Sequence, residues 1–162
     1  MRRGSVVALL VASALAFEAR AAEPTATAVE FFHGGLRSYA LTADAAEIAR
    51  LDAHAGWSRT GGRFGVFANA SDAPGTVPVC RFRRPLAIEA QAIFYSADAA
   101  ECALVGGSGA WVAEGVAFHV LPVGSGPCPA GSTPVWRSFD PGAPGRESNH
   151  RYTVDATVEA RM

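Results

Sequence analysis

Two stretches of the chain share the pattern W-x-x-x-G-x-x-F: WSRTGGRF at residues 57–64 and WVAEGVAF at residues 111–118. Their tryptophans lie 54 positions apart, and the same offset separates TADAAE at residues 42–47 from SADAAE at residues 96–101. Two blocks that recur together at one offset indicate an internal repeat, because chance rarely preserves both the blocks and their spacing. The chain is therefore expected to be built from copies of one unit.

Each unit is expected to begin with two short strands joined by a loop. The apolar patterns predict first strands at 29–32, 79–82 and 135–139 and second strands at 38–41, 93–95 and 150–152. An aspartate follows each second strand, at positions 44, 98 and 155, and in the first two units it predicts the N-cap of a short helix. Helices are expected at about 45–54 and 99–104, with Glu47 and Glu101 also binding N–H groups at the helix start. The W-x-x-x-G-x-x-F block then supplies one or two more strands.

The sequence thus predicts a strand-rich α+β fold of three pseudo-symmetric units, each of the form strand–strand–short helix–strand pair. The units cover about 29–73, 77–123 and 133–162 and form a single repeat domain, 29–162, after a linker at 22–28. The W-x-x-x-G-x-x-F block does not recur after residue 133, so the third unit is expected to be incomplete. Marginal stability and exposed apolar surface are expected near residues 135–152.

The first 21 residues have the zones of a secretory signal peptide. Two arginines precede an apolar run at 6–17, and small residues follow before the expected cleavage between Ala21 and Ala22. The run is shorter than the roughly 20 residues that a membrane-spanning helix needs, and no later segment is apolar enough to span. We therefore expect a secreted protein, extracellular or periplasmic, without a membrane span once the signal peptide is removed.

The charge balance disfavours nucleic acid as a partner. Removal of the signal peptide leaves 11 of the 14 basic residues and 14 of the 15 acidic ones, a net charge near −3. Every basic residue is arginine, and the cluster of Arg81, Arg83 and Arg84 is expected to occupy solvated positions on a strand and its turn. No nucleic-acid partner is expected, because nonspecific binding to phosphates depends on a basic surface.

The three cysteines, Cys80, Cys102 and Cys128, can form one disulfide and leave one thiol. Cys80 and Cys102 lie in the same unit and are the preferred pair, while Cys102 with Cys128 remains the alternative. No two cysteines or histidines have the close spacing of neighbouring zinc ligands, so no metal site is expected.

Candidate ligand contacts lie in the loops between the first and second strands, about 33–37, 83–91 and 140–150. These loops differ in length between units, and variable loops on a common scaffold often carry binding sites. His33, Arg37 and His150 lie in or beside them and are the candidate ligand-binding residues. Trp57 and Trp111 keep the same place in each unit and are expected in the core, with sugar stacking as the less favoured role.

At these blocks the sequence resembles a repeat domain of unknown function that is widespread in secreted bacterial proteins, often beside hydrolase or cell-wall-active domains. Its units look like V-P-V-Y-R-F-Y-N, then S-H-F-Y-T, then a helix with A-E, then G-W-x-x-E-G-x-A-F. The matching segments here are residues 77–82, 94–96, 100–101, 111–118, 134–137 and 149–153. The resemblance implies a three-unit α+β domain with pseudo-threefold arrangement that attaches to cell-surface or polysaccharide material.

No catalytic residue is assigned, since the chain has no G-x-S-x-G elbow and its histidines lack a repeated carboxylate partner. The leading hypothesis is a secreted non-catalytic binding or accessory module for a cell-surface or extracellular glycan, with no cofactor. A small secreted hydrolase or hydrolase-associated subunit, using Glu114 or His150, is one alternative. A degenerate fragment without independent function is the other.

Overall fold

The computed structural model describes residues 22–85, 92–122, 124, 126–142 and 148–161. The expected signal peptide, with Ala21, lies outside the described residues, as do residues 86–91 and 143–147 of two candidate loops. The strands are β1 (Ala26–His33), β2 (Ser38–Thr42), β3 (Trp57–Val66), β4 (Val77–Arg83), β5 (Ile93–Ser96), β6 (Val112–Val120), β7 (Trp136–Asp140) and β8 (Asn149–Thr153). The helices are α1 (Ala45–Asp52), α2 (Ala99–Gly107) and α3 (Ala156–Glu159), with a 3-10 turn, η1 (Ala70–Asp72).

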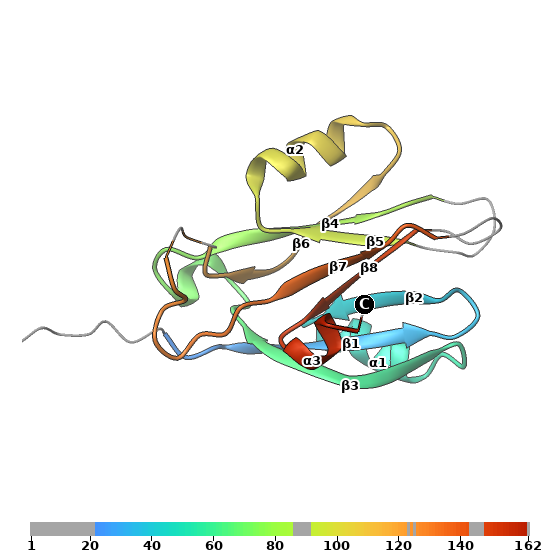
Figure 1. Ribbon diagram of the computed structural model, residues 1–162, viewed down its shortest axis with the longest axis horizontal. Coiled ribbons are helices and arrows are strands. Elements are labelled where there is room, and N and C mark those ends of the chain that lie inside the picture. The colour runs from blue at the N-terminus through green and yellow to red at the C-terminus, as the bar shows by residue number, and fades with distance from the viewer. Residues whose placement is uncertain (1–21, 86–91, 123, 125, 143–147, 162) are drawn as a thin grey trace, which may run out of the picture.

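The fold is strand-rich, with three small antiparallel sheets and few helices, in agreement with the α+β class. The sheets have the strand orders β2-β1-β3, β5-β4-β6 and β7-β8. The second strands of the three sheets, β2, β5 and β8, contact one another pairwise, so the sheets meet along these strands. The C-terminal ends of β1, β4 and β7 lie at the same end of the molecule, on the right in Figure 1. The first strand begins at Ala26, inside the segment expected to be a linker.

Each W-x-x-x-G-x-x-F block forms one long strand rather than a pair of strands. The glycine of the pattern has a positive φ in both blocks, 90° at Gly61 and 99° at Gly115. The pairing register shifts near these glycines, between Val29 and Phe31 on β1 and between Arg81 and Phe82 on β4. A bulge with a left-handed residue favours glycine, because a side chain there would clash with its own backbone. This explains why both copies have glycine at this position.

The expected aspartate caps are confirmed at α1 and α2, and the structure shows that Asp155 caps α3 in the same way. Asp44, Asp98 and Asp155 accept hydrogen bonds from backbone N–H groups in the first turn of α1, α2 and α3. The expected end of the second helix was wrong, since α2 continues through Gly106 to Gly107. Glycine weakens a helix without ending it, and the left-handed residue follows later, at Gly109 with a φ of 69°.

The core lies between the first two sheets, and tyrosine hydroxyl groups join the second sheet to the first and the third sheet to the second. Phe31 is fully buried at its centre. The Tyr95 hydroxyl donates to Leu41 O at 2.7 Å and accepts from Leu41 N at 2.9 Å. The Tyr152 hydroxyl makes the same pair of bonds with the backbone of Tyr95, at 2.7 and 2.8 Å. Each hydroxyl therefore satisfies the backbone of a strand in the neighbouring sheet, and burial raises the pKa of Tyr95 to about 12.

The tryptophans of the two blocks are half-buried. Trp57 packs against the core cluster, with its ring edge-on to His33 at 5.1 Å between centroids. Trp111 packs against Phe94 at 5.9 Å. Both indoles thus pack within the scaffold.

Exposed apolar surface was expected near residues 135–152, and Phe139, within this region, is 56% exposed.

Candidate functional site

A pocket of about 240 Å³ opens where the ends of the first and third sheets meet. We call it the loop pocket; it is lined by Phe32, Arg37, Tyr39, Asp140, Asn149 and His150. Two of the three candidate ligand-binding residues are thus brought together, Arg37 from the β1–β2 turn and His150 from β8. The third, His33, does not line this pocket.

Arg37 is held at the pocket by the turn between β1 and β2. It has a φ of 53°, a left-handed conformation that few residues other than glycine adopt. Its carbonyl oxygen accepts a 2.5 Å hydrogen bond from Asn149 Nδ2, and Asn149 is only 8% exposed. This bond joins the β1–β2 turn to the start of β8, so it fixes the two sides of the loop pocket relative to each other.

Aromatic rings form the apolar wall of the loop pocket. The rings of Phe32 and Tyr39 lie 4.8 Å apart between centroids. The guanidinium of Arg151 lies over the Tyr39 ring at 4.7 Å, which holds the ring in place by a cation–π contact. The wall is therefore preformed by packing.

His150 lies between two phenylalanine rings, Phe139 at 4.8 Å and Phe94 at 5.2 Å between centroids. Burial, with a smaller contribution from the positive charge of Arg137, lowers the pKa of His150 to about 4. Its Nδ1 atom is buried without a hydrogen-bond partner among the described residues. The imidazole is therefore neutral at physiological pH and serves the pocket as a polar but uncharged ring.

A pH dependence of stability follows from this shift. Between pH 6.5 and 4 the unfolded chain binds a proton on His150 that the folded chain does not, so stability falls as the pH falls through this range. We expect His150 to raise the unfolding equilibrium constant by roughly tenfold between pH 7 and 5. Urea titrations of the wild type and of His150→Phe at both pH values measure this contribution, because phenylalanine suits the aromatic surroundings and does not titrate. An equal loss of stability in both proteins would contradict the expectation.

His33 lies on the other side of the β1–β2 turn and is committed to local packing. Its Nδ1 accepts a 3.1 Å hydrogen bond from Leu36 N, and its ring lies 5.9 Å from that of His54. The ring packs so closely on Gly56 that a Cβ there would lie 2.0 Å from His33 Nε2. These contacts favour a structural role for His33.

A second hollow, of about 300 Å³, lies between the first two sheets and is lined by an ion-pair cluster. Arg81 binds Glu47 of α1 at 2.6 Å and Glu114 of β6 at 2.8 Å, and its side chain is only 15% exposed. Arg83 also pairs with Glu114, at 3.1 Å. The expectation that Arg81 is solvated was therefore wrong, since its partners come from other elements. Glu114 is bound by two arginines, which favours a structural role over catalysis.

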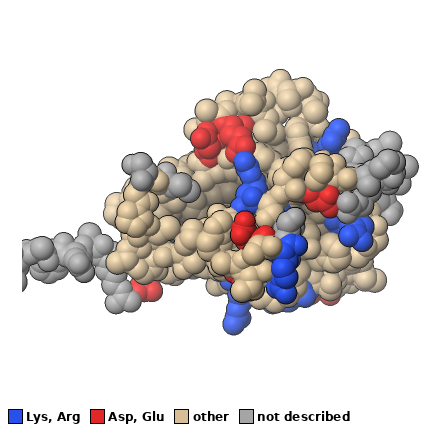
Figure 2. Space-filling view, viewed as in Figure 1, with Lys and Arg blue, Asp and Glu red and all other residues tan. Residues whose placement is uncertain are grey.

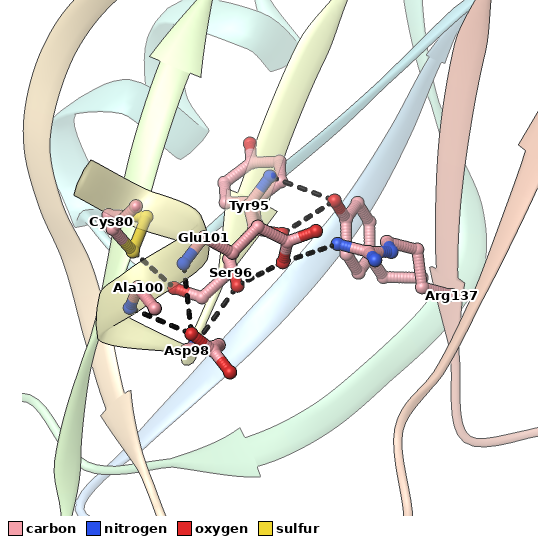
Figure 3. Close-up of a disulfide and its surroundings, with 9 residues drawn as sticks. Cys80, Tyr95, Ser96, Asp98, Ala100, Glu101 and Arg137 are labelled. Atoms are coloured by element: carbon pink, nitrogen blue, oxygen red, sulfur yellow. Dashed lines mark hydrogen bonds and ion pairs between the residues drawn. A yellow bond between two sulfur atoms is a disulfide. The ribbon is translucent and has the colours of Figure 1, made fainter. Parts of the chain in front are cut away.

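The acidic residue at the start of each longer helix pairs with the neighbouring sheet. Burial would raise the pKa of Glu47, but the hydrogen bonds and charge of Arg81 lower it below its usual value. Glu101 accepts from Arg137 Nη1 at 2.8 Å and from the Ser96 hydroxyl at 2.5 Å, as Figure 3 shows. The sequence predicts that Glu47 and Glu101 bind N–H groups at the helix start. Their carboxylates instead form ion pairs with an arginine of the neighbouring sheet, Arg81 and Arg137 respectively.

A third ion pair joins the third sheet back to the first. Glu30 of β1 is 2% exposed, and its two carboxylate oxygens accept from Arg151 Nε and Nη2 at 2.9 Å each. The Thr60 hydroxyl donates a further bond, at 2.5 Å, to Glu30 Oε2. Sequence reasoning missed this residue, although a lone glutamate within an apolar strand segment is a signal of a buried, paired charge.

The preferred disulfide is confirmed. Cys80 on β4 and Cys102 on α2 are joined, with 6.1 Å between their Cα atoms, and Cys128 is free and exposed. The bond fastens α2 beside the Glu101–Arg137 pair (Figure 3).

Charge and metal-ligand patterns give little further indication of a partner. On the face shown in Figure 2, acidic and basic side chains lie beside one another across the middle, and most of the surface carries neither. In the part of the chain that the structure describes, no three His, Cys, Asp or Glu side chains group as a metal site requires. No helix among the described residues is long and apolar enough to cross a membrane.

Comparison with known proteins places the chain in a family. No curated protein and no solved structure matches it. A family described as a domain of unknown function, DUF5648, matches residues 27–162, which include all eight strands except the first residue of β1. The match covers most of the sequence, and the chain therefore belongs to the DUF5648 family.

Proposed function

We propose that the protein is a secreted, non-catalytic binding module that holds a sugar unit of a cell-surface or extracellular glycan in the loop pocket. The observation that supports this most is the convergence of Arg37, Asn149 and the aromatic wall in one preformed pocket. Sugars present apolar C–H faces beside hydroxyl groups, so they suit a site with an aromatic wall and a few fixed polar groups. The pocket is smaller than the roughly 300–1,000 Å³ of sites for drug-sized ligands, which suits one ring of a longer chain.

A binding role is favoured over glycoside hydrolysis by the carboxylates at the pocket. Hydrolysis of a glycosidic bond requires two carboxyl groups roughly 5–10 Å apart across the substrate. Among the described lining residues Asp140 is the one carboxylate, and its Oδ1 accepts a 2.9 Å hydrogen bond from Gly142 N. Glu114, the acid considered for a hydrolase, lies instead at the hollow between the first two sheets.

The proposal includes three pseudo-symmetric units. The phenylalanine that ends each W-x-x-x-G-x-x-F block pairs with a buried residue of the first strand, Phe64 with Ala28 and Phe118 with Val79. Val79 lies directly before Cys80, and Ala28 lies directly before Val29, which takes the place of Cys80 in the first sheet. Strand order is also the same in the first two sheets, and β7 and β8 pair as the first two strands of those sheets do. Repetition would place the variable turns of three units at one end of the molecule, where the loop pocket lies.

Secretion is proposed from the signal-like residues 1–21 and supported by the disulfide. Disulfides persist in oxidising compartments and are rare in reducing ones. The Cys80–Cys102 bond therefore suits an extracellular or periplasmic protein. Export would also place the loop pocket in contact with cell-wall and extracellular polysaccharides.

Retention on insoluble polysaccharides, followed by a glycan array, tests the proposed function. The variant Arg37→Asn removes the guanidinium at the pocket, while asparagine tolerates the left-handed backbone at this position. We expect the wild type to be retained on at least one material. The Arg37→Asn variant should bind that material about tenfold more weakly, because it loses a charge-assisted hydrogen bond to the glycan.

Arg63→Asn serves as the matched control, because Arg63 is exposed on β3 and does not line the pocket. It should bind like the wild type. Folded wild-type protein that is retained on no glycan, or an Arg37→Asn variant that binds as well as the wild type, would refute the proposed function.

A further inference from the structure

The guanidinium of Arg37 is a charged group at the loop pocket that no described residue binds. Arg37 lines the pocket and is exposed, and its side chain forms no ion pair or hydrogen bond with the described part of the chain. By contrast Arg59, Arg81, Arg137 and Arg151 each pair with a carboxylate. We propose that the sugar held in the loop pocket is a uronic acid, whose carboxylate binds the Arg37 guanidinium. This inference rests on the proposed function and names the class of sugar.

The backbone conformation of Arg37 also points to a ligand. No other residue except glycine has a positive φ in the described part of the chain, and glycine or asparagine would adopt this conformation more readily. Asn149 holds the strained turn through the carbonyl oxygen of Arg37. Every residue type has that carbonyl, so the bond accounts for the conformation but not for an arginine. Strained residues held in place by their surroundings cluster at ligand sites, which fits a guanidinium that is positioned for binding.

The other polar groups of the loop pocket limit the charge that the ligand can carry. The Asn149 amide is fully engaged, since its Oδ1 accepts from His150 N and its Nδ2 donates to Arg37 O. His150 is neutral at physiological pH, because burial lowers its pKa to about 4. Asp140 adds one carboxylate to the lining. One positive and one negative charge suit a sugar with a single carboxylate better than a densely charged polyanion.

A uronic acid has the groups that this lining can bind. Its ring presents C–H groups to the aromatic wall of Phe32 and Tyr39. Its carboxylate can accept two parallel hydrogen bonds from the planar guanidinium, which are stronger than bonds to a neutral hydroxyl group. Its hydroxyl groups can donate to the Asp140 carboxylate. The aromatic rings beside the guanidinium also exclude water, which strengthens the ion pair.

Matched acidic and neutral polysaccharides test this inference. Polygalacturonate, alginate and a glucuronate polymer are each compared with their carboxyl-reduced forms, in which a primary alcohol replaces the carboxylate on the same ring. Affinity electrophoresis of the folded chain in native gels that contain each polymer measures the dissociation constants. We expect the wild type to bind at least one acidic polymer about tenfold more tightly than its reduced form, because only the acidic form supplies a charged acceptor.

The Arg37→Asn variant should bind both forms of that polymer equally and weakly, because the preference for the carboxylate depends on the guanidinium. Arg63→Asn is again the matched control, since Arg63 is exposed on β3 outside the pocket, and it should keep the preference of the wild type. An Arg37→Asn variant that keeps the preference would overturn the assignment.

The wild type alone separates this inference from the proposed function. Binding to glycans with equal affinity for every acidic polymer and its reduced form would overturn the uronic acid and leave the proposed function standing. Tighter binding of a sulfated polymer or of an amino-sugar polymer than of all three acidic polymers would do the same. Folded protein that binds no glycan at all would refute both.

Discussion

The Glu30→Gln variant is expected to lose about 3 kcal/mol of unfolding free energy, because it leaves the Arg151 guanidinium without its buried counterion. Glu30 is 2% exposed and accepts two 2.9 Å hydrogen bonds from Arg151, whose side chain is 18% exposed. The pair joins β1 of the first sheet to β8 of the third, so its loss also weakens the contact that holds the loop pocket together. Urea denaturation followed by circular dichroism measures the change.

Two further variants make the test specific. The double variant Glu30→Gln/Arg151→Gln removes both charges and should recover part of the lost stability, because no uncompensated charge remains. Asp52→Asn breaks the exposed pair between Asp52 and Arg59, where the side chains are 41% and 51% exposed, and should leave the midpoint unchanged. A Glu30→Gln effect no larger than that of Asp52→Asn would show that the buried pair contributes little.

Replacement of Cys80 and Cys102 by alanine is expected to cost about 3 kcal/mol, the value for opening a loop of this length. The cysteines are 22 positions apart, and their bond fastens α2 to β4. Loss of the bond enlarges the set of unfolded conformations and frees the helix that carries Glu101. The midpoint of urea denaturation for the double variant should match that of the wild type under reducing conditions.

Cys128→Ala is the matched control for the disulfide, because this cysteine is free and exposed. It should denature like the wild type without reductant and lose stability like the wild type when reductant is added. A wild-type midpoint that does not respond to reductant, or an equal loss in Cys128→Ala without reductant, would contradict the assigned pairing.

Features that depend on neighbours in the sequence could be predicted well. The aspartate caps and the start of each helix follow from side chains within a few residues of the backbone groups that they bind. The preferred disulfide was also predictable, because both cysteines belong to one unit.

Charged residues could not be placed from the sequence in the same way. Arg81 was expected in solvent, and Glu47 was expected to bind helix N–H groups, yet they bind each other across 34 positions of sequence. The sequence around Arg81 gives no sign that its partner is Glu47, because the two side chains meet only when α1 packs beside β4. The distinction between a solvated and a buried arginine therefore depended on packing between sheets.

The candidate site was only partly predictable. The variable loops predict His33, Arg37 and His150 as ligand contacts. The structure brings Arg37 and His150 together, whereas His33 packs against Gly56. Asn149, which bonds to the carbonyl of Arg37 across 112 positions, gave no local signal of this role. The sequence predicts Tyr39 only as a strand residue. Its place in the aromatic wall depends on the contacts of its ring with Phe32 and with the Arg151 guanidinium.

The sequence by itself determined the class of the fold, the caps of the two longer helices and the preferred disulfide, because each follows from recurring local patterns. Only the tertiary structure decided which charges meet and which loop ends form a pocket. Glu30 and Arg151 are 121 positions apart, and their contact requires three separate sheets to be packed together.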